Sequence, residues 1–328
     1  MFADRVTRDR DERLVPELRR AALGLSAEPD QHTPQEKKES MMTEMTKIAF
    51  LGLGRMGREL VNHLVERADV DLVVWNRSAG PTESYRHRGI QVADSPAQAW
   101  ADADIVMTCL FGPDAVREVI LEANTSLPES TTWVDISTVG PIFAEECAQW
   151  SRAHHVAYVH SPVLGSLGPA RAGGLGVLIG GDDADARTKT RQFVSLWADA
   201  DRIVEYDCAV KAASGKLIIN YGLAVGMQAI IEATRIGQSG GMTQAEAIDL
   251  LKMPKTPLSV IAAMKADLIA TRDYSDTQFS TNLLAKDSDL MLTVAQDQPL
   301  PALVTAFAAL EHARRAGHGE DDFASMAG

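Results

Sequence analysis

A glycine-rich turn between an apolar run and a helical pattern limits the folds open to this chain more than any other feature. Ile48 to Leu51 is apolar, and Gly52-Leu53-Gly54-Arg55-Met56-Gly57 follows it directly. In such a G-x-G-x-x-G pattern, the first glycine permits a tight turn and the second lets a pyrophosphate approach the backbone. The third lets helix and strand pack closely, and the N–H groups of the new helix then face the phosphates. The stretch therefore predicts a strand, a turn and a helix that bind a dinucleotide.

The residues after this turn complete a β-α-β unit. The pattern from Arg58 to Arg67 predicts a helix, and Val70 to Trp75 predicts a second buried strand. Asn76-Arg77-Ser78 follows about 20 residues past the glycines, where a dinucleotide fold places the group that reads the ribose. An NAD site has Asp or Glu there, whereas an NADP site offers Arg to the 2′-phosphate. We therefore expect NADP(H) to bind through Arg77, with no carboxylate nearby to repel it; the alternative is that Arg77 is a solvated loop cation.

Strand and helix patterns alternate as far as about residue 207, and only helical patterns follow. Further strands are expected at 90–92, 104–109, 132–135, 156–159 and 176–179, and the later helices at 208–240, 243–252, 258–270, 282–297 and 303–317. This order predicts an α/β Rossmann domain at 46–207, joined by a long helix to an all-α domain at 208–328. Leu110 and Ser137-Thr138 follow two of the strands, at the carboxyl ends where ligands collect in a parallel sheet.

The composition excludes several classes of function. The formal net charge of −13 argues against a nucleic-acid-binding surface, which needs clustered Lys and Arg. The uncharged stretch from Leu217 to Ile231 is shorter than the roughly 20 apolar residues of a membrane span, so no membrane segment is expected. Cys109, Cys147 and Cys208 lie far apart without metal-ligand spacing. We expect a cytoplasmic protein without a metal site.

Residues 1–45 are charged and turn-rich, without the apolar run of a secretory signal. Leu14, Leu18 and Leu25 are spaced for a short amphipathic helix, but a solvated, flexible extension is the favoured interpretation. We expect deletion of residues 1–44 to leave solubility and cofactor affinity nearly unchanged.

The head of the long helical pattern carries a second candidate site. Lys216 and Asn220 are one turn apart and share a face. A partly desolvated Lys216 would donate to a developing alkoxide while Asn220 fixes the substrate, although a solvated surface lysine is the commoner outcome. The apolar sequence from Lys216 to Glu232 needs cover on nearly all sides, which predicts a homodimer.

Five motifs together resemble the β-hydroxyacid dehydrogenase family, which includes 3-hydroxyisobutyrate dehydrogenases and glyoxylate/succinic semialdehyde reductases. They are the glycine turn, Asp135-Ile136-Ser137-Thr138 with Pro141, Ser161-Pro162-Val163-Leu164-Gly165-Ser166, Lys216-x-x-x-Asn220 and Lys286-Asp287. The resemblance covers about residues 46–325 and implies a Rossmann domain, a helical C-terminal domain and homodimers or homotetramers. It also implies a small carbonyl or hydroxy-acid substrate and an NADP(H)-dependent enzyme acting on CH–OH.

The resemblance assigns roles residue by residue. Lys216 is the catalytic acid/base, Asn220 a substrate ligand and Lys286 a helper near the nicotinamide. Gly165 and Ser166 contribute to an anion pocket for the substrate carboxylate, and Ser137 lines the cleft. The expected cofactor contacts are Gly52, Leu53, Gly54, Arg55, Met56, Gly57, Asn76, Arg77, Ser78, Leu110, Thr138 and Lys286.

Three positions depart from the family pattern. Leu164 stands where the family usually has a serine, and Val210-Lys211-Ala212 stands where a Gly-x-Gly is usual, which narrows the space expected near the nicotinamide. The identity of the substrate is therefore not carried over from the family, and the sequence does not reveal the physiological direction or the oligomer size. Two alternatives stay open: an imine reductase-like C=N reductase, against which Lys216 speaks, and a non-catalytic NADP-binding scaffold or sensor.

Overall fold

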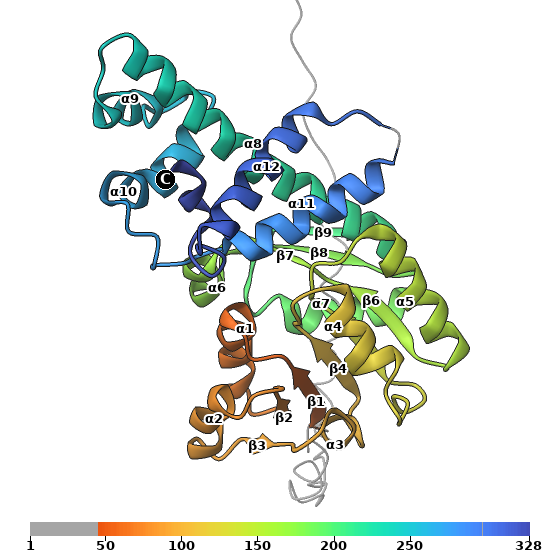
Figure 1. Cartoon of the computed structure of the whole chain (residues 1–328). Helices are drawn as coiled ribbons and strands as arrows, with labels where there is room; N and C mark the ends of the chain where they lie inside the picture. The colour runs from red at the N-terminus through yellow and green to blue at the C-terminus, as the bar shows by residue number, and fades with distance from the viewer. Residues whose placement is uncertain (1–44, 297) are drawn as a thin grey trace, which may run out of the picture. The chain divides into compact units, whose positions relative to one another are not determined.

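The computed structural model describes residues 45–296 and 298–328, so the amphipathic pattern predicted around Leu14, Leu18 and Leu25 lies outside the described residues. One sheet of nine strands runs through the first part of this region, in the order β3-β2-β1-β4-β5-β6-β8-β7, with β9 beside β8 (Figure 1). The strands are β1 (Thr46–Leu51), β2 (Val70–Trp75), β3 (Gln91–Val92), β4 (Ile105–Thr108), β5 (Thr132–Asp135), β6 (Ala157–His160), β7 (Val163–Leu164), β8 (Leu175–Gly180) and β9 (Ala198–Tyr206). β1 to β6 are mutually parallel, whereas β8 runs antiparallel to β6 and β7 and parallel to β9.

Helices cover both faces of the sheet and then form a second, all-helical part. The first group is α1 (Arg55–Val65), η1 (Gly80–Thr82), α2 (Glu83–His87), α3 (Pro96–Trp100), α4 (Pro113–Val116), the π-helical η2 (Arg117–Leu121), α5 (Pro141–Ala153), α6 (Leu167–Ala172) and α7 (Ala184–Val194). The second group is α8 (Ala209–Ser239), α9 (Gln244–Leu251), α10 (Ser259–Thr271), α11 (Thr281–Ala295), α12 (Pro301–Arg315) and the short η3 (Phe323–Ala327). This is the predicted Rossmann-like sheet domain followed by a helical C-terminal part. The exact domain boundaries stay predictions.

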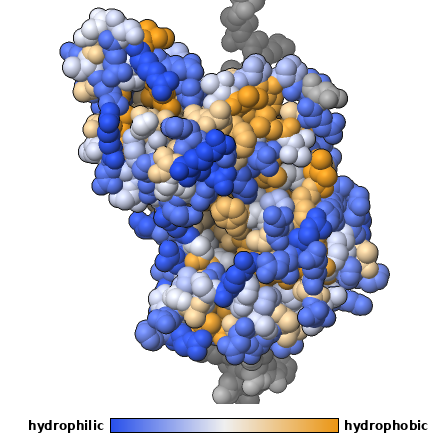
Figure 2. Space-filling view, in the orientation of Figure 1, coloured by the Kyte–Doolittle hydropathy of each residue, from blue (hydrophilic) through white to orange (hydrophobic). Residues whose placement is uncertain are grey.

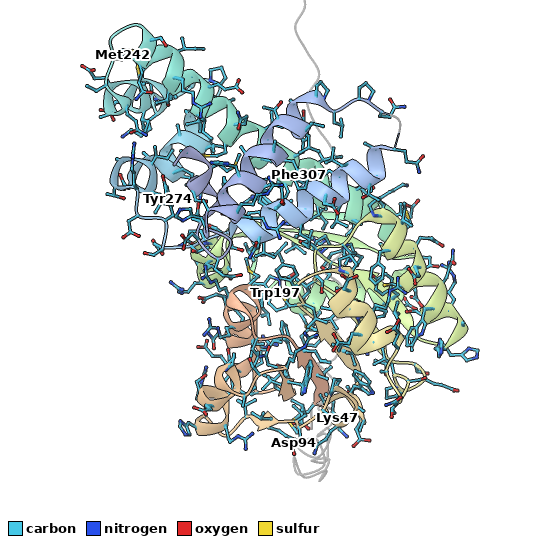
Figure 3. All side chains as sticks on the ribbon, viewed as in Figure 1. Lys47, Asp94, Trp197, Met242, Tyr274 and Phe307 are labelled. Atoms are coloured by element: carbon cyan, nitrogen blue, oxygen red, sulfur yellow. The ribbon has the colours of Figure 1, made fainter. Side chains whose placement is uncertain are left out.

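The side chains of β1 point alternately to the two faces of the sheet, and they contribute to a separate buried cluster on each face. Ile48 and Phe50 belong to one buried cluster, which also contains Trp197 (Figure 3), while Ala49 and Leu51 belong to the cluster on the opposite face. Successive side chains of a strand point to opposite faces, so a central strand with both faces covered must be apolar throughout. A third buried cluster fills the helical part, between α8 and the helices that follow it.

The strand order of the sheet changes direction at β1: β2 and β3 are added on one side of it, and β4, β5 and β6 on the other. β2 pairs with one edge of β1 and β4 with the other, so the loops after β1 and β4 diverge at their carboxyl ends. Such a switch point leaves a crevice in which open α/β sheets bind their ligands. The glycine turn follows β1 and Leu110 follows β4, so both predicted cofactor loops flank this point.

Several elements differ from the sequence-based expectation, among them β7 and α6, which were not expected, and β9 and α8. β9 was not predicted, because its sequence ADADRIVEY is polar and largely exposed at the edge of the sheet beside β8. α8 is long and apolar enough, by length and composition alone, to cross a membrane, contrary to the estimate from Leu217 to Ile231. About 39% of its most apolar window is buried inside the protein, and its side chains from Leu217 to Ile231 contribute to the helical core.

Candidate active site at the strand ends

The glycine turn has the geometry that a phosphate-binding loop requires. Gly52 has a φ of +106°, and a Cβ there would collide with the Cys109 carbonyl. A Cβ at Gly57 would collide with the Gly52 carbonyl, so helix and turn are in direct contact. Gly54 differs, because nothing lies within 4 Å of a Cβ built on it. No neighbouring atom would therefore obstruct a phosphate group that approached the backbone of Gly54 at the start of α1, so the turn fits the pyrophosphate of a dinucleotide.

Asn76 braces this turn from the end of β2. Its Oδ1 accepts from the Leu53 N–H at 2.9 Å, and its Nδ2 donates to the Ser78 carbonyl at 3.0 Å and to Ser78 Oγ at 3.1 Å. These bonds join the glycine turn to the loop that follows β2. Asn76 therefore holds the binding loop in shape through its side chain.

Arg77 lies at the expected strand end but has an acidic neighbour that the sequence analysis excluded. Its Nη2 donates to Glu118 Oε2 at 2.5 Å, and both side chains are largely exposed. The expectation that no carboxylate stands near Arg77 is therefore wrong. Glu118 is 41 positions away in the sequence, in η2, which comes after β4 and α4; β2 and β4 pair with opposite edges of β1.

The loops after β4 and β5 are tied together beneath the crevice. Ser137 Oγ accepts from the Leu110 N–H at 2.9 Å, and Asp135 Oδ1 accepts from the Ser137 N–H at 3.0 Å. Thr108 donates to the same Asp135 oxygen at 2.8 Å. Ser137 and Asp135 are both buried, so they fix the loops that carry Leu110 and Thr138.

Lys216 is buried, contrary to the common fate of a helix lysine. Its Nζ donates to the Val163 carbonyl at 2.7 Å, which joins α8 to β7. Burial lowers the pKa of Lys216 to about 8; Asp287 partly offsets this by raising it, and Lys286 lowers it further. Burial also raises the pKa of the nearby Cys109 thiol to about 12, so this thiol stays protonated. A pKa of about 8 suits a group to proton transfer near neutral pH.

Asn220 and Lys286 meet at Asp287 on α11. Asn220 Nδ2 donates to Asp287 Oδ2 at 2.5 Å, and both residues are buried. Lys286 Nζ donates to the Thr138 carbonyl at 2.8 Å and lies 2.7 Å from Asp287 Oδ1, although that oxygen accepts no hydrogen bond from the described residues. Asp287 therefore links the two helices that carry the predicted catalytic groups.

Lys286 also reaches the loop after β4. Its stem packs on Gly112, where a Cβ would lie 2.9 Å from Lys286 Cδ. Its ammonium lies 5.9 Å from the centre of the exposed Phe111 ring. One side chain of α11 thus contacts the loops after both β4 and β5.

Gly165 and Ser166 lie beside the Lys216 anchor, in the turn between β7 and α6. Gly165 has a φ of +137° and is exposed, and Ser166 is half-buried at the start of α6 without a capping side-chain bond. Leu164 pairs with Gly176 of β8, and a Cβ on Gly176 would lie 3.1 Å from Leu164 Cβ. Because Gly176 has no side chain, there is space beside it for the side chain of Leu164.

The two other departures from the family pattern lie at the start of α8. Ala212 is buried against Gly180, where its Cβ would be 2.7 Å from a built Cβ. Val210 is half-buried and lines a shallow hollow with Pro141 and Ile142 of α5. Both residues pack between α8 and the sheet domain.

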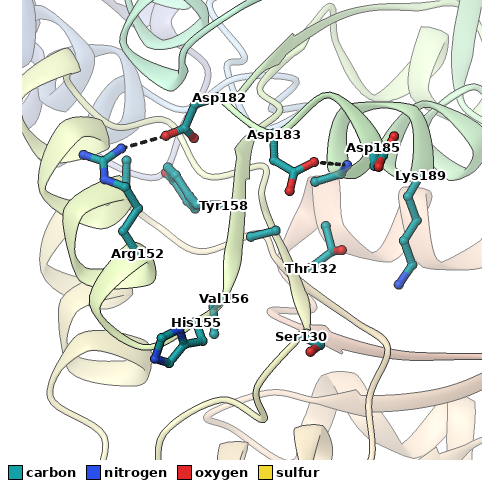
Figure 4. Close-up of a pocket in the computed structure, with 13 residues that line it drawn as sticks. Ser130, Thr132, Arg152, His155, Val156, Tyr158, Asp182, Asp183, Asp185 and Lys189 are labelled. Atoms are coloured by element: carbon teal, nitrogen blue, oxygen red, sulfur yellow. Dashed lines mark hydrogen bonds and ion pairs between the residues drawn. The ribbon is translucent and has the colours of Figure 1, made fainter.

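A larger hollow of about 690 Å³ lies elsewhere (Figure 4). Thr132 and Ala157, the first residues of β5 and β6, line it together with Arg152 and Asp182, which form an ion pair at 2.8 Å. It is therefore at the amino ends of these strands, opposite the glycine turn. Within residues 45–296 and 298–328 there is no cluster of three His, Cys, Asp or Glu side chains that could hold a metal ion.

Sequence reasoning missed three contributors to this site: the Val163 carbonyl, Asp287 as a link between helices, and Glu118. Lys286-Asp287 stood out as a motif, but Ser288 and Asp289 follow it in α11, so the local sequence does not mark Asp287 rather than its polar neighbours as the link. The other two depend on contacts between residues 53 and 41 positions apart, which no local pattern reveals.

The sheet is mostly parallel and has a glycine turn at its switch point, and the helices that follow carry Lys216, Asn220 and Lys286. This combination is typical of two-domain dehydrogenases that use a nicotinamide cofactor. Comparison with known proteins agrees. Residues 47–206 match the NAD-binding domain model of 6-phosphogluconate dehydrogenase, and residues 211–328 match the NAD-binding model of NADP-dependent 3-hydroxyisobutyrate dehydrogenase. The chain belongs to the β-hydroxyacid dehydrogenase family, and it is an NAD(P)-dependent oxidoreductase with a small-molecule substrate.

Individual relatives agree with this family. The chain is 27% identical, over 86% of its length and 84% of the relative, to the probable 3-hydroxyisobutyrate dehydrogenase-like 1, mitochondrial, of Arabidopsis thaliana. It superposes with a TM-score of 0.74 and 25% identity on a Mycobacterium tuberculosis 3-hydroxyisobutyrate dehydrogenase solved with L-serine, covering 86% of this chain and 98% of that one. An imine reductase from Pseudomonas sp. shares the fold at a TM-score of 0.55 and 21% identity, covering 86% and 98% of the two chains.

Proposed function

We propose that this protein is an NADP(H)-dependent enzyme that interconverts a small hydroxy acid or alcohol with its aldehyde or keto form. The observation that carries the proposal is the buried ammonium of Lys216, whose pKa is lowered to about 8 where α8 meets the strand-end loops. A group with a pKa near the working pH can donate a proton in one direction and accept it in the other.

Reduced nicotinamide, when bound, supplies a hydride to the carbonyl carbon. As the carbonyl oxygen gains charge, Lys216 gives it a proton and the product is a hydroxyl group. In the oxidative direction neutral Lys216 takes the hydroxyl proton. Asn220, oriented by Asp287 at 2.5 Å, positions the substrate oxygen, and Ser137, Gly165 and Ser166 surround the rest of the substrate.

The support for NADP(H) is Arg77 at the end of β2, where its guanidinium is exposed and can pair with a 2′-phosphate. Glu118 competes with the 2′-phosphate for the same guanidinium. It therefore weakens the preference for NADP(H) over NAD(H), but Arg77 remains able to pair with the phosphate. The cofactor contacts proposed here are the glycine turn, Asn76, Arg77, Ser78, Leu110, Thr138 and Lys286.

We also propose a homodimer or homotetramer in the cytoplasm. Large apolar side chains are exposed where α8, α9 and α10 meet, and apolar surface is visible beside α9 in Figure 2. Ile236 and Val260 are 75% and 72% exposed, and Leu250, Met253 and Met264 are exposed as well. A second copy would cover this surface, so Ile236→Glu should lower the molar mass measured by light scattering.

A screen with NADPH and NADH tests the enzymatic proposal. Small aldehydes, keto acids and cyclic imines are offered separately, and loss of the reduced nicotinamide absorbance is followed. Turnover of an aldehyde or keto acid that is lost in Lys216→Ala supports the proposal. Turnover of imines alone makes the imine reductase-like activity the function, and cofactor binding with no turnover of any substrate makes the chain an NADP-binding scaffold or sensor.

A further inference from the structure

Arg55 connects the glycine turn to the helical part of the chain. It is the first residue of α1, and its Nη1 donates to the Thr277 carbonyl at 3.0 Å. The two residues are 222 positions apart, and Thr277 lies in the loop between α10 and α11. The start of the predicted phosphate-binding helix is therefore bonded to the segment that leads into α11.

The acceptor side of this bond is held firmly. Thr277 Oγ1 donates to the Glu320 carbonyl at 3.0 Å, and the N–H groups of Gln278 and Phe279 donate to Asp322 Oδ2 at 3.1 and 3.3 Å. Asp322 is fully buried and paired with the buried Lys265 at 2.8 Å. Tyr274, at the start of the same loop, is also buried (Figure 3). The Thr277 carbonyl is thus a fixed point on the helical part.

The donor of this bond, the Arg55 guanidinium, can make further hydrogen bonds. A guanidinium carries five N–H groups and stays charged at every relevant pH, and the hydrogen bond to Thr277 uses one of them. Arg55 is exposed at the positive end of α1, next to the open space at Gly54. Its other N–H groups make no hydrogen bond to the residues that the structure describes, and a neutral carbonyl acceptor does not prevent them from pairing with a phosphate.

We propose that Arg55 is a positioning residue that joins the phosphates of the bound dinucleotide to the α10–α11 loop. Cofactor occupancy then fixes the position of the helical part, with Lys286 and Asp287 on α11, relative to the glycine turn. This inference rests on the proposed function for the cofactor site, but it adds a role to Arg55 that a phosphate contact alone does not have. It makes the dinucleotide part of the link between the sheet domain and the helical part.

Hydrogen exchange with mass spectrometry tests this link on the full chain. Exchange is measured in peptides that cover 52–57 and 273–280, with and without saturating NADP⁺ or NAD⁺, whichever binds more tightly. The variants are Arg55→Ala, Arg55→Lys and the matched control Arg58→Ala. Arg58 is exposed on the same helix and makes no side-chain hydrogen bond to the described residues.

In the wild type and in Arg58→Ala, the cofactor should protect both peptides. In Arg55→Ala it should still protect 52–57, since the backbone of the glycine turn is intact, but protection of 273–280 should be lost. The dissociation rate of the cofactor should rise about tenfold, as expected for the loss of one charge-assisted contact. Arg55→Lys keeps the charge without the fork, so it should restore the dissociation rate in part and leave 273–280 unprotected.

Equal cofactor-induced protection of 273–280 in wild type and Arg55→Ala would overturn the link while leaving the cofactor site intact. Absence of protection at 52–57 in the wild type would instead overturn the cofactor site itself, and the link with it.

Discussion

Lys216 and Val163 are joined by a 2.7 Å hydrogen bond from the lysine ammonium to the main-chain carbonyl, at the point where α8 crosses the end of β7. The carbonyl compensates part of the cost of burying a cation, and it directs the ammonium toward the strand ends.

Replacement of Lys216 by alanine should lower turnover by about 10²–10⁴-fold, the usual contribution of a positioned general acid. Binding of NADPH should hardly change, because Lys216 is assigned to the substrate oxygen. Lys216→Arg should not rescue activity, since a guanidinium has the wrong shape and does not release its proton. Lys211→Ala is the control, because Lys211 lies on the same helix, is exposed and pairs with Asp207. Wild-type turnover of Lys216→Ala on a carbonyl substrate would remove this lysine from the mechanism.

The pH dependence should have opposite signs in the two directions. Carbonyl reduction needs protonated Lys216, so its kcat/KM should fall as the pH rises through about 8. Alcohol oxidation needs the neutral amine, so its kcat/KM should rise over the same range. The Cys109 thiol, with a pKa of about 12, does not titrate in this window. Profiles that are flat between pH 7 and pH 9, a range of about one unit on either side of that pKa, would contradict the assignment.

Asp287→Asn should move the reduction profile toward lower pH. The carboxylate raises the pKa of Lys216, so removal of its charge leaves burial and Lys286 to lower that pKa further. The asparagine oxygen can still accept from Asn220, which separates the charge effect from the hydrogen bond. Asp289→Asn, an exposed change on the same helix α11, is the control and should leave the profile in place. An unshifted profile in Asp287→Asn would show that its charge does not reach Lys216.

The ion pair between Arg77 and Glu118 should tune the choice of cofactor. Arg77→Ala should weaken NADPH binding by roughly ten- to a hundredfold and leave NADH binding nearly unchanged. Glu118→Gln frees the guanidinium, so NADPH should bind about two- to fivefold more tightly, a size typical of exposed charge pairs. Titration of both cofactors into these variants and into the control Arg86→Ala, exposed on α2, measures the effect. Equal affinity of the wild type for NADPH and NADH would refute the NADP preference.

Local patterns predicted most of this fold because its central elements follow single periodicities. The apolar runs of β1, β2, β4 and β5 and the glycine turn are legible in the sequence, as are the five helices from α8 to α12. β9 was missed because it is an edge strand whose side chains are mostly exposed, so selection for an apolar face is weak there. The length of the apolar part of α8 was underestimated, because the charged residues Lys216, Glu232 and Arg235 interrupt its uncharged sequence.

The candidate site was predicted in parts rather than as a whole. Lys216 and Asn220 share a helix face, so their proximity follows from spacing. Their burial and their link to Asp287 do not follow from spacing, because they depend on α11 packing against α8. Glu118 was missed for the same reason, since its contact with Arg77 joins the segments that follow β2 and β4, two strands on opposite sides of β1.

The three glycines of the turn are subject to different constraints. Gly52 and Gly57 are required by the folded backbone itself, because any side chain there meets a carbonyl group. Gly54 has an ordinary φ of −64° and open space around it, so the folded chain without its cofactor would accept an alanine there. In a library of variants, changes at Gly52 and Gly57 would be lost from the soluble fraction, whereas changes at Gly54 would remain abundant and inactive. Conservation of a glycine at position 54 would therefore reflect ligand binding and not folding. A relative with another residue there would be expected to keep the fold but not to bind the dinucleotide.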